Sequence, residues 1–276
     1  TNFALKRDYL EQLIKAIRDG RIEPGESSSA LDTLPAGRLI TLWNNVVTSN
    51  PQSPMLENLA LTLGTRGLWD PLKEGVSSQH ARVRLLALQS LHGTAPQTAR
   101  PFLERALEDR EPKVRLFAIQ GLAGKSERVD DCLQDTNPEV QAEAAVRCSP
   151  IREDVLNQML SSHERTARLA ALKRIPASMV GKAEGFLDSQ VSSEVVAALD
   201  IMGSFGKAPQ VETLRKLFQR PDPAVRKAVV LAATLYKKEV SSQVLEIRMV
   251  ECMVECMWSV CMVECMVECM VECMWS

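Results

Sequence analysis

Four arginines stand out because each occupies the same position in a repeated segment. These are Arg84, Arg115, Arg168 and Arg226, and two further copies of the segment carry Gln141 and Val195 at this position. A guanidinium binds phosphates and carboxylates, so this arginine column could form a basic stripe that grips an acidic peptide or a phosphate backbone. It could also form an internal ladder, in which each arginine bonds to a turn carboxylate such as Asp109 or Asp135.

The charge balance favours the ladder. Residues 1–248 hold 33 basic and 30 acidic residues, a net charge of +3. Proteins that bind nucleic acid usually carry a much stronger basic excess. We therefore expect a protein or peptide partner and no nucleic acid. The four arginines remain candidate binding residues, with the structural ladder as the favoured interpretation.

The other reactive side chains match no catalytic or metal-binding pattern. His80, His92 and His163 have no second ligand at metal spacing, and the chain contains no P-loop, GxGxxG, GxSxG or HExxH motif. Six cysteines recur with CxxxC spacing near the C-terminus, which fits no zinc or iron–sulfur motif. We expect no catalytic residue, no cofactor site and no metal site.

Self-comparison shows the repeats that must position the arginines. Copies of the segment begin at a recurrent anchor position, with steps of 31, 26, 27, 27 and 31 residues: Val83, Val114, Val140, Ala167, Glu194 and Val225. The fifth position is small, with alanine in five copies and Val229 in the last, which allows helices to approach closely. The turn position, five residues before the anchor, carries Ser78, Asp109, Asp135, Ser162, Ser189 and the exception Arg220. Such residues satisfy free amides at turns and helix starts.

The repeats predict pairs of helices. Each segment opens a second helix, as in 112–123, 138–148, 164–175 and 223–237. The first helices are expected over 101–109, 126–135, 152–162 and 208–219, and a further pair over 36–49 and 55–63. Within the second helices, we expect the aromatic ring of Phe117 to be buried.

Three regions follow from this pattern. Residues 1–37 form an N-terminal helix (3–18) and a linker rich in Gly, Pro and Ser, residues 38–248 form the repeat array, and residues 249–276 form a tail. The tail repeats the tetrapeptide MVEC and has low complexity. On a helix, a four-residue period drifts around the axis, so the tail offers no fixed apolar face and we expect it to be dispensable for folding.

The repeats resemble the HEAT family, especially its short HEAT-like variant named after phycobilisome lyases. The resemblance rests on Asp109–Ala118 (DREPKVRLFA), on Asp222–Arg226 (DPAVR) and on Asp135–Val140 (DTNPEV), and it covers about 55–240. The chain departs from the family pattern at Gln141, where arginine is usual, and at the Ala167 and Glu194 repeats, which lack both Pro and the preceding Asp. The resemblance implies an all-α fold, a right-handed α-solenoid of stacked helix pairs.

The resemblance says little about function, because the family contains scaffolds, adaptors, transport receptors and a few enzymes. We expect a non-enzymatic scaffold or adaptor that binds a protein or peptide along its concave face. The alternatives are an enzyme on the same fold, either bilin-lyase-like or DNA-glycosylase-like, and the solenoid segment of a larger protein. Two body cysteines, Cys132 and Cys148, and the lack of a long apolar run favour a cytoplasmic protein without a membrane helix.

Overall fold

The elements of the described chain are helices. The computed structural model describes residues 31–122 and 126–239, and within these ranges it contains no strand. The fold is therefore all-α, as the repeats predict. The predicted helix 3–18, most of the predicted linker and the tail 249–276 lie outside the described residues.

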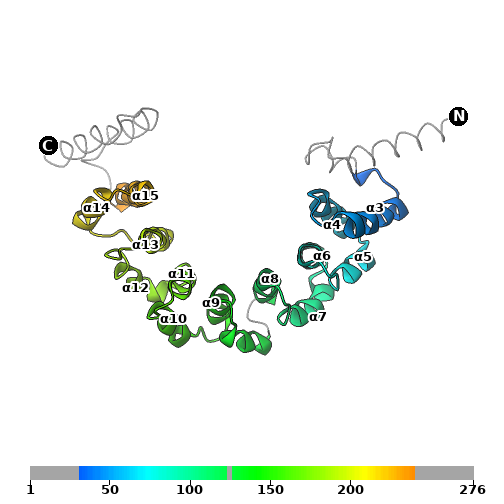
Figure 1. Cartoon of the computed structure of the whole chain (residues 1–276), viewed down its shortest axis with the longest axis horizontal. Coiled ribbons are helices and arrows are strands. Elements are labelled where there is room, and N and C mark those ends of the chain that lie inside the picture. Colours follow the sequence, from blue (N-terminus) through cyan, green and yellow to red (C-terminus); the bar gives the residue numbers. More distant parts are fainter. Residues whose placement is uncertain (1–30, 123–125, 240–276) are drawn as a thin grey trace. The chain divides into compact units, whose positions relative to one another are not determined.

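The chain forms two compact units, which divide between Ala171 and Leu172. The elements of the first unit are α3 (Ala36–Ser49), α4 (Met55–Thr65), α5 (Trp69–Gly75), α6 (Ala81–Thr94), α7 (Pro96–Ala106), α8 (Pro112–Leu122), η1 (Glu127–Gln134), α9 (Pro138–Arg147), α10 (Glu153–Leu160) and all but the last residue of α11 (Arg165–Leu172). The second unit contains η2 (Ala177–Met179), α12 (Gly181–Glu184), α13 (Ser192–Ser204), α14 (Val211–Phe218) and α15 (Pro223–Glu239). Figure 1 labels the α-helices.

The second helices of the repeats form where the sequence predicts them. Helices α8, α9, α11 and α15 begin within one residue of the expected starts, and α6 and α13 follow the same pattern. In the first unit α4, α6, α8 and α9 contact one another in series, while α5, α7 and η1 pack beside them (Figure 1). In the second unit α13 packs on α15, and α14 packs on α15.

The first helices differ more from the prediction. Helix α7 begins at Pro96 instead of residue 101, so Pro101 lies inside it. A proline so near the helix start removes only one backbone hydrogen bond, which the helix tolerates. The element at 127–134 is a 3₁₀ helix, in which Val129 and Cys132, three residues apart, share the buried side.

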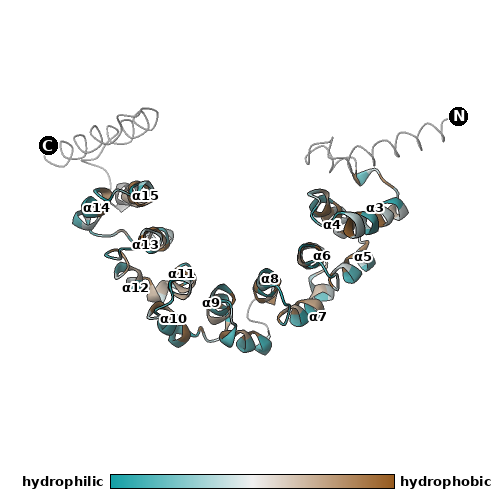
Figure 2. Ribbon diagram, in the orientation of Figure 1, coloured by the Kyte–Doolittle hydropathy of each residue, from teal (hydrophilic) through white to brown (hydrophobic). Residues whose placement is uncertain are grey.

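The core follows the repeat positions. The anchor residues are buried in all six repeats, and the five alanines at the fifth position, Ala87, Ala118, Ala144, Ala171 and Ala198, are 0% exposed. Polar and apolar residues accordingly mix within each helix (Figure 2). Leu31 and Leu34 are also buried, so packed structure begins before residue 38, where the array was expected to start.

The prediction for Phe117 was wrong. Its side chain is only half-buried and meets the imidazole of His92 edge to face, with 6.0 Å between ring centroids. The neighbouring Ile119 is 0% exposed and fills the core instead. Position four of the segment therefore lies at the border of the buried face.

None of the helices in the described ranges is both long and apolar enough to cross a membrane.

Burial at these two positions predicts different losses of stability. We expect Ile119→Ala to lower the free energy of unfolding by about 2–5 kcal/mol, because it leaves a cavity in the core. Phe117→Ala should cost roughly 1–2 kcal/mol, because only part of its ring leaves water. Urea denaturation of both variants measures the difference, and a larger loss for Phe117→Ala would contradict the observed register.

Close packing of α4 on α6 depends on Gly64. A methyl group on Gly64 would lie 2.3 Å from the Ser90 hydroxyl, which donates a 2.5 Å hydrogen bond to the carbonyl of Ala60. We expect Gly64→Ala to cost about 1–3 kcal/mol through overpacking. Gly93→Ala on α6 is the control, because nothing lies within 4 Å of its added methyl group. It should be neutral or raise the melting temperature, since alanine favours helix.

Candidate functional site

The candidate site begins with the turns that precede the second helices. The side chain at the turn position accepts a hydrogen bond from the backbone N–H two residues later. The pairs are Ser78 with His80, Asp109 with Glu111, Asp135 with Asn137, Ser162 with Glu164 and Ser189 with Val191, at 2.8–3.2 Å. This confirms the expected role of Asp and Ser at these turns. In the last repeat Asp222 takes the role and binds the N–H of Ala224.

The turns fix backbone carbonyls that the arginine column uses. In four repeats the Nη1 of the arginine donates to the carbonyl oxygen six residues earlier, at 2.7–2.9 Å. The pairs are Arg84 with Ser78, Arg115 with Asp109, Arg168 with Ser162 and Arg226 with Arg220. Each guanidinium therefore ties the start of its helix to the turn of its own repeat.

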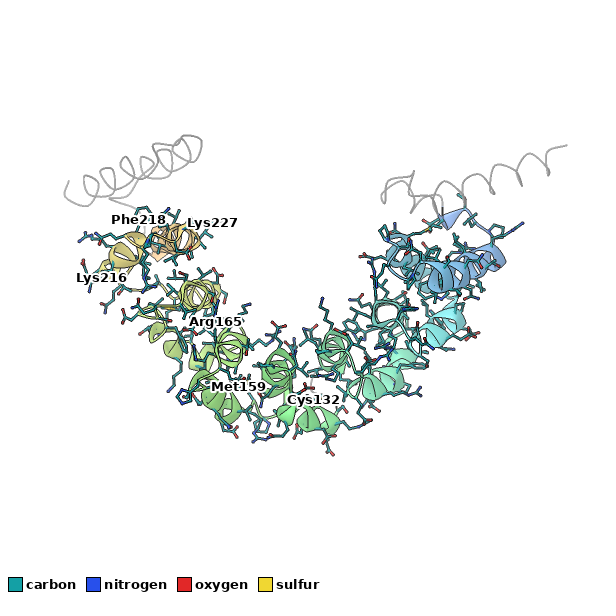
Figure 3. The ribbon with its side chains drawn as sticks, viewed as in Figure 1. Cys132, Met159, Arg165, Lys216, Phe218 and Lys227 are labelled. Atoms are coloured by element: carbon teal, nitrogen blue, oxygen red, sulfur yellow. The ribbon has the colours of Figure 1, made fainter. Side chains whose placement is uncertain are left out.

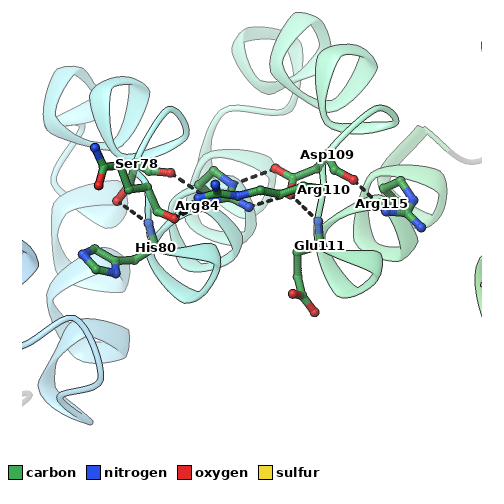
Figure 4. Close-up of polar contacts among 8 residues, drawn as sticks. Ser78, His80, Arg84, Asp109, Arg110, Glu111 and Arg115 are labelled. Carbon is green, nitrogen blue, oxygen red and sulfur yellow. Dashed lines mark hydrogen bonds and ion pairs between the residues drawn. The ribbon is translucent and has the colours of Figure 1, made fainter.

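Two of these arginines also reach the next repeat. Arg84 donates from Nε and Nη2 to both carboxylate oxygens of Asp109, at 2.7 and 2.6 Å (Figure 4). Arg115 makes the same two-pronged contact with Asp135, at 2.7 Å for both bonds. We call each such Arg–Asp pair a rung. The rungs and carbonyl contacts form one continuous polar chain from Ser78 to Asp135.

The rungs lie largely out of water. The side chains of Arg84 and Asp109 are 7% and 12% exposed, and those of Arg115 and Asp135 are 12% and 9% exposed. Burial alone would raise the pKa of Asp109, but the hydrogen bonds from Arg84 and from the Glu111 N–H outweigh it and lower that pKa. The hydrogen bonds to Asp109 and Asp135 raise the pKa of Arg84 and of Arg115. The Arg84–Asp109 pair is therefore fully charged at neutral pH.

The column is not uniform. Gln141 donates to the carbonyl of Leu133. Arg168 and Arg226 each make a second carbonyl contact, with His163 and with Pro221. The structure thus brings Arg84 and Arg115 together with the turn carboxylates, as the ladder predicts, and places Arg168 and Arg226 on their own turns.

One ladder residue escaped the sequence analysis. Arg220 is the exception at the turn position, and Val195 is an exception in the arginine column. In the second unit Arg220 donates from Nη1 to the carbonyl of Ser189, at 2.7 Å. This is the carbonyl that an arginine at position 195 would have bound, six residues earlier. The two exceptions compensate each other, and their coincidence in adjacent repeats was the available signal.

The anchor exception Glu194 is also accommodated. The residue is 3% exposed, and its carboxylate accepts a 2.6 Å hydrogen bond from the Ser189 hydroxyl. Glu194 therefore caps its own turn from a position that is apolar in the other repeats.

The cysteines of the body are poor nucleophiles. Cys132 (Figure 3) and Cys148 are buried free thiols. Burial, with help from Asp135 and Asp131, raises the pKa of Cys132 to about 11. Burial and a hydrogen bond with Asp130 raise the pKa of Cys148 to about 12. Because the thiolate is the reactive form, both thiols are unreactive near neutral pH.

The histidines lie apart from one another. His80 and His163 are exposed in turns, whereas His92 packs on Phe117. Within the described ranges, no group of three His, Cys, Asp or Glu side chains could hold a metal ion.

Comparison with known proteins finds distant structural likenesses. No protein-family profile and no curated protein sequence matches the chain. Two engineered proteins with crystal structures from the Northeast Structural Genomics Consortium are similar, each at 17% identity. One match covers 84% of this chain and 79% of the other at a TM-score of 0.36, and the second covers 73% and 97% at 0.33. At these TM-scores neither likeness bears on function.

The lowered pKa of Asp109 makes its rung sensitive to acid. We expect Asp109→Asn to destabilise the protein at pH 7 by about 3 kcal/mol, because it leaves the buried Arg84 without its counter-charge. The stabilisation by Asp109 is complete above its unfolded pKa, about 3.9, and is lost as the pH falls through the lower folded pKa. The difference in free energy of unfolding between wild type and Asp109→Asn should therefore become smaller below pH 4.

Urea denaturation between pH 7 and pH 3 measures that difference. Asp70→Asn is the control, because Asp70 pairs with Lys73 at the surface with 88% of its side chain exposed. It should change stability by less than about 1 kcal/mol at every pH. If Asp109→Asn lowers the free energy of unfolding by the same amount at pH 7 and at pH 3, the rung is not the source of the lost stability.

Proposed function

We propose that this chain is a non-enzymatic scaffold for protein–protein interaction, built as a right-handed α-solenoid of HEAT-like helix pairs. The serial contacts of α4, α6, α8 and α9 support this architecture, as do the rungs that join consecutive repeats. In such a solenoid the second helices line the concave side, and the partner is a protein or peptide that lies along it.

The observation that carries the proposal is a recurrence at exposed and half-buried positions. Helices α6 and α8 carry a basic residue, a leucine and a glutamine with the same spacing. The two sets are Arg82, Leu85 and Gln89, and Lys113, Leu116 and Gln120. Residues at i, i+3 and i+7 share one face of a helix, and α6 packs directly on α8.

Packing does not require three of these six residues. Gln89, Lys113 and Gln120 are exposed, and Leu85 and Leu116 are half-buried. Arg82 donates a 3.1 Å hydrogen bond to the carbonyl of Gln52, which lies between α3 and α4. A partner that spans both helices and makes equivalent contacts with each would account for the recurrence. We call this face the α6–α8 face.

Two arginines of the column have a structural role in this proposal and do not bind the partner. Arg84 and Arg115 hold the repeats together, and their substitution should lower stability without changing the affinity of molecules that remain folded. The glutamines of the α6–α8 face should affect affinity without changing stability.

A pair of matched double variants tests this division. The wild-type chain is first used to isolate a stoichiometric partner from cell extract, which mass spectrometry identifies. Calorimetric titration with the purified partner then compares Gln89→Ala/Gln120→Ala with the control Gln97→Ala/Gln134→Ala, whose glutamines are exposed on α7 and η1. We expect the first double variant to bind roughly tenfold more weakly, through two lost hydrogen bonds, and the control to bind within about twofold of wild type. Equal affinities for the two double variants would refute the α6–α8 face as the binding surface.

A further inference from the structure

We propose that the first unit contains a built-in joint between α9 and α11, where one rung is missing, and that this joint opens before the repeats that precede it. Opening of this joint depends on the local stability of the array and does not require a partner.

The preceding repeats are linked by rungs. Arg84 connects the Val83 repeat to the turn of the Val114 repeat through Asp109. Arg115 connects the Val114 repeat to the turn of the Val140 repeat through Asp135. To separate either pair of repeats, a buried two-pronged ion pair must be broken, which leaves a charge without its partner.

The next rung would join Gln141 to Ser162, but both side chains bond within their own repeats instead. Gln141 donates a side-chain N–H to the carbonyl of Leu133, in its own repeat, at 2.9 Å. The Ser162 hydroxyl accepts the N–H of Glu164, in its own turn, at 3.1 Å. A carboxamide and a hydroxyl also lack the charges that strengthen the other rungs. The charged rungs of Arg84 and Arg115 therefore have no counterpart between Gln141 and Ser162.

Two core positions at the same place carry smaller side chains. The sixth position of the segment carries Leu88 on α6 and Ile119 on α8, but Ala145 on α9, and all three are buried. The anchor is Val83 and Val114 in the earlier repeats, but Ala167 on α11. Each methylene removed from a buried position forfeits about 0.8 kcal/mol of burial free energy. The joint thus combines a missing rung with smaller core side chains.

The missing rung can be restored with residues that this chain already uses. Aspartate at the turn position keeps the contact with the N–H two residues later, as Asp109 and Asp135 show. Arginine at position 141 can use the carbonyl six residues earlier, as Arg84 does with Ser78. The double substitution Gln141→Arg/Ser162→Asp therefore adds a rung without disturbing the turn. The reverse change, Arg115→Gln/Asp135→Ser, moves the gap one repeat earlier.

Hydrogen exchange of the full chain, read by mass spectrometry, tests the joint. In wild type we expect backbone amides of α10 and α11 to exchange at least tenfold faster than those of α6 and α8 under native conditions. Gln141→Arg/Ser162→Asp should slow exchange in α10 and α11 by about tenfold and leave α6 and α8 unchanged. Arg115→Gln/Asp135→Ser should accelerate exchange in η1 and α9.

Two results would overturn the proposal. One is equal protection of α6, α8, α10 and α11 in wild type. The other is a restored-rung variant that keeps wild-type helicity by circular dichroism but shows no slowing in α10 and α11. The second result would overturn the proposal even if Arg115→Gln/Asp135→Ser does not fold. Gln141→Arg/Ser162→Asp adds a contact between repeats and removes none, so it can be tested by itself.

Discussion

A buried guanidinium that serves two repeats at once is the interaction on which the array depends. Arg84 donates four hydrogen bonds. Two go to the carbonyls of Ser78 and Gln79 in its own turn, and two go to the carboxylate of Asp109. Burying so polar a group is tolerable only when its donors are satisfied. The turn must therefore present its carbonyls, and the next repeat must present its carboxylate. Turn geometry, helix register and repeat spacing are all tied to this requirement.

The same requirement explains a departure from the repeat pattern. Where Val195 removes the arginine, the Ser189 carbonyl would lose its donor. Arg220 supplies a donor from the following turn, at 2.7 Å. The position of the arginine changes, whereas the carbonyl contact is kept. This indicates that the acceptor carbonyl, which the turn fixes, is the more constant part of the interaction.

The sequence predicts well those features whose residues recur at the same position in every repeat. The second helices were located closely because anchor, alanine and turn residues recur together, and Asp109 and Asp135 were foreseen as arginine partners. The first helices have no such column, so the start of α7 at Pro96 and the 3₁₀ form of η1 escaped prediction. Phe117 was misjudged because hydrophobicity does not reveal which edge of a helix borders solvent. Arg220 was missed because its contact joins two repeats. When the turn position is compared by itself, Arg220 is only an exception to the pattern.

The geometry also constrains how the array can bind a partner. An arginine with five N–H donors, four of them already engaged and only 7% of its side chain exposed, has little left to offer a phosphate or a peptide carboxylate. To bind such a group, Arg84 would have to leave Asp109, and the carboxylate would lose the partner that lowers its pKa. Binding a partner through the rungs would thus weaken the contacts between repeats. In the scaffold that we propose, the partner is therefore recognised by side chains that packing leaves exposed, such as Gln89 and Gln120.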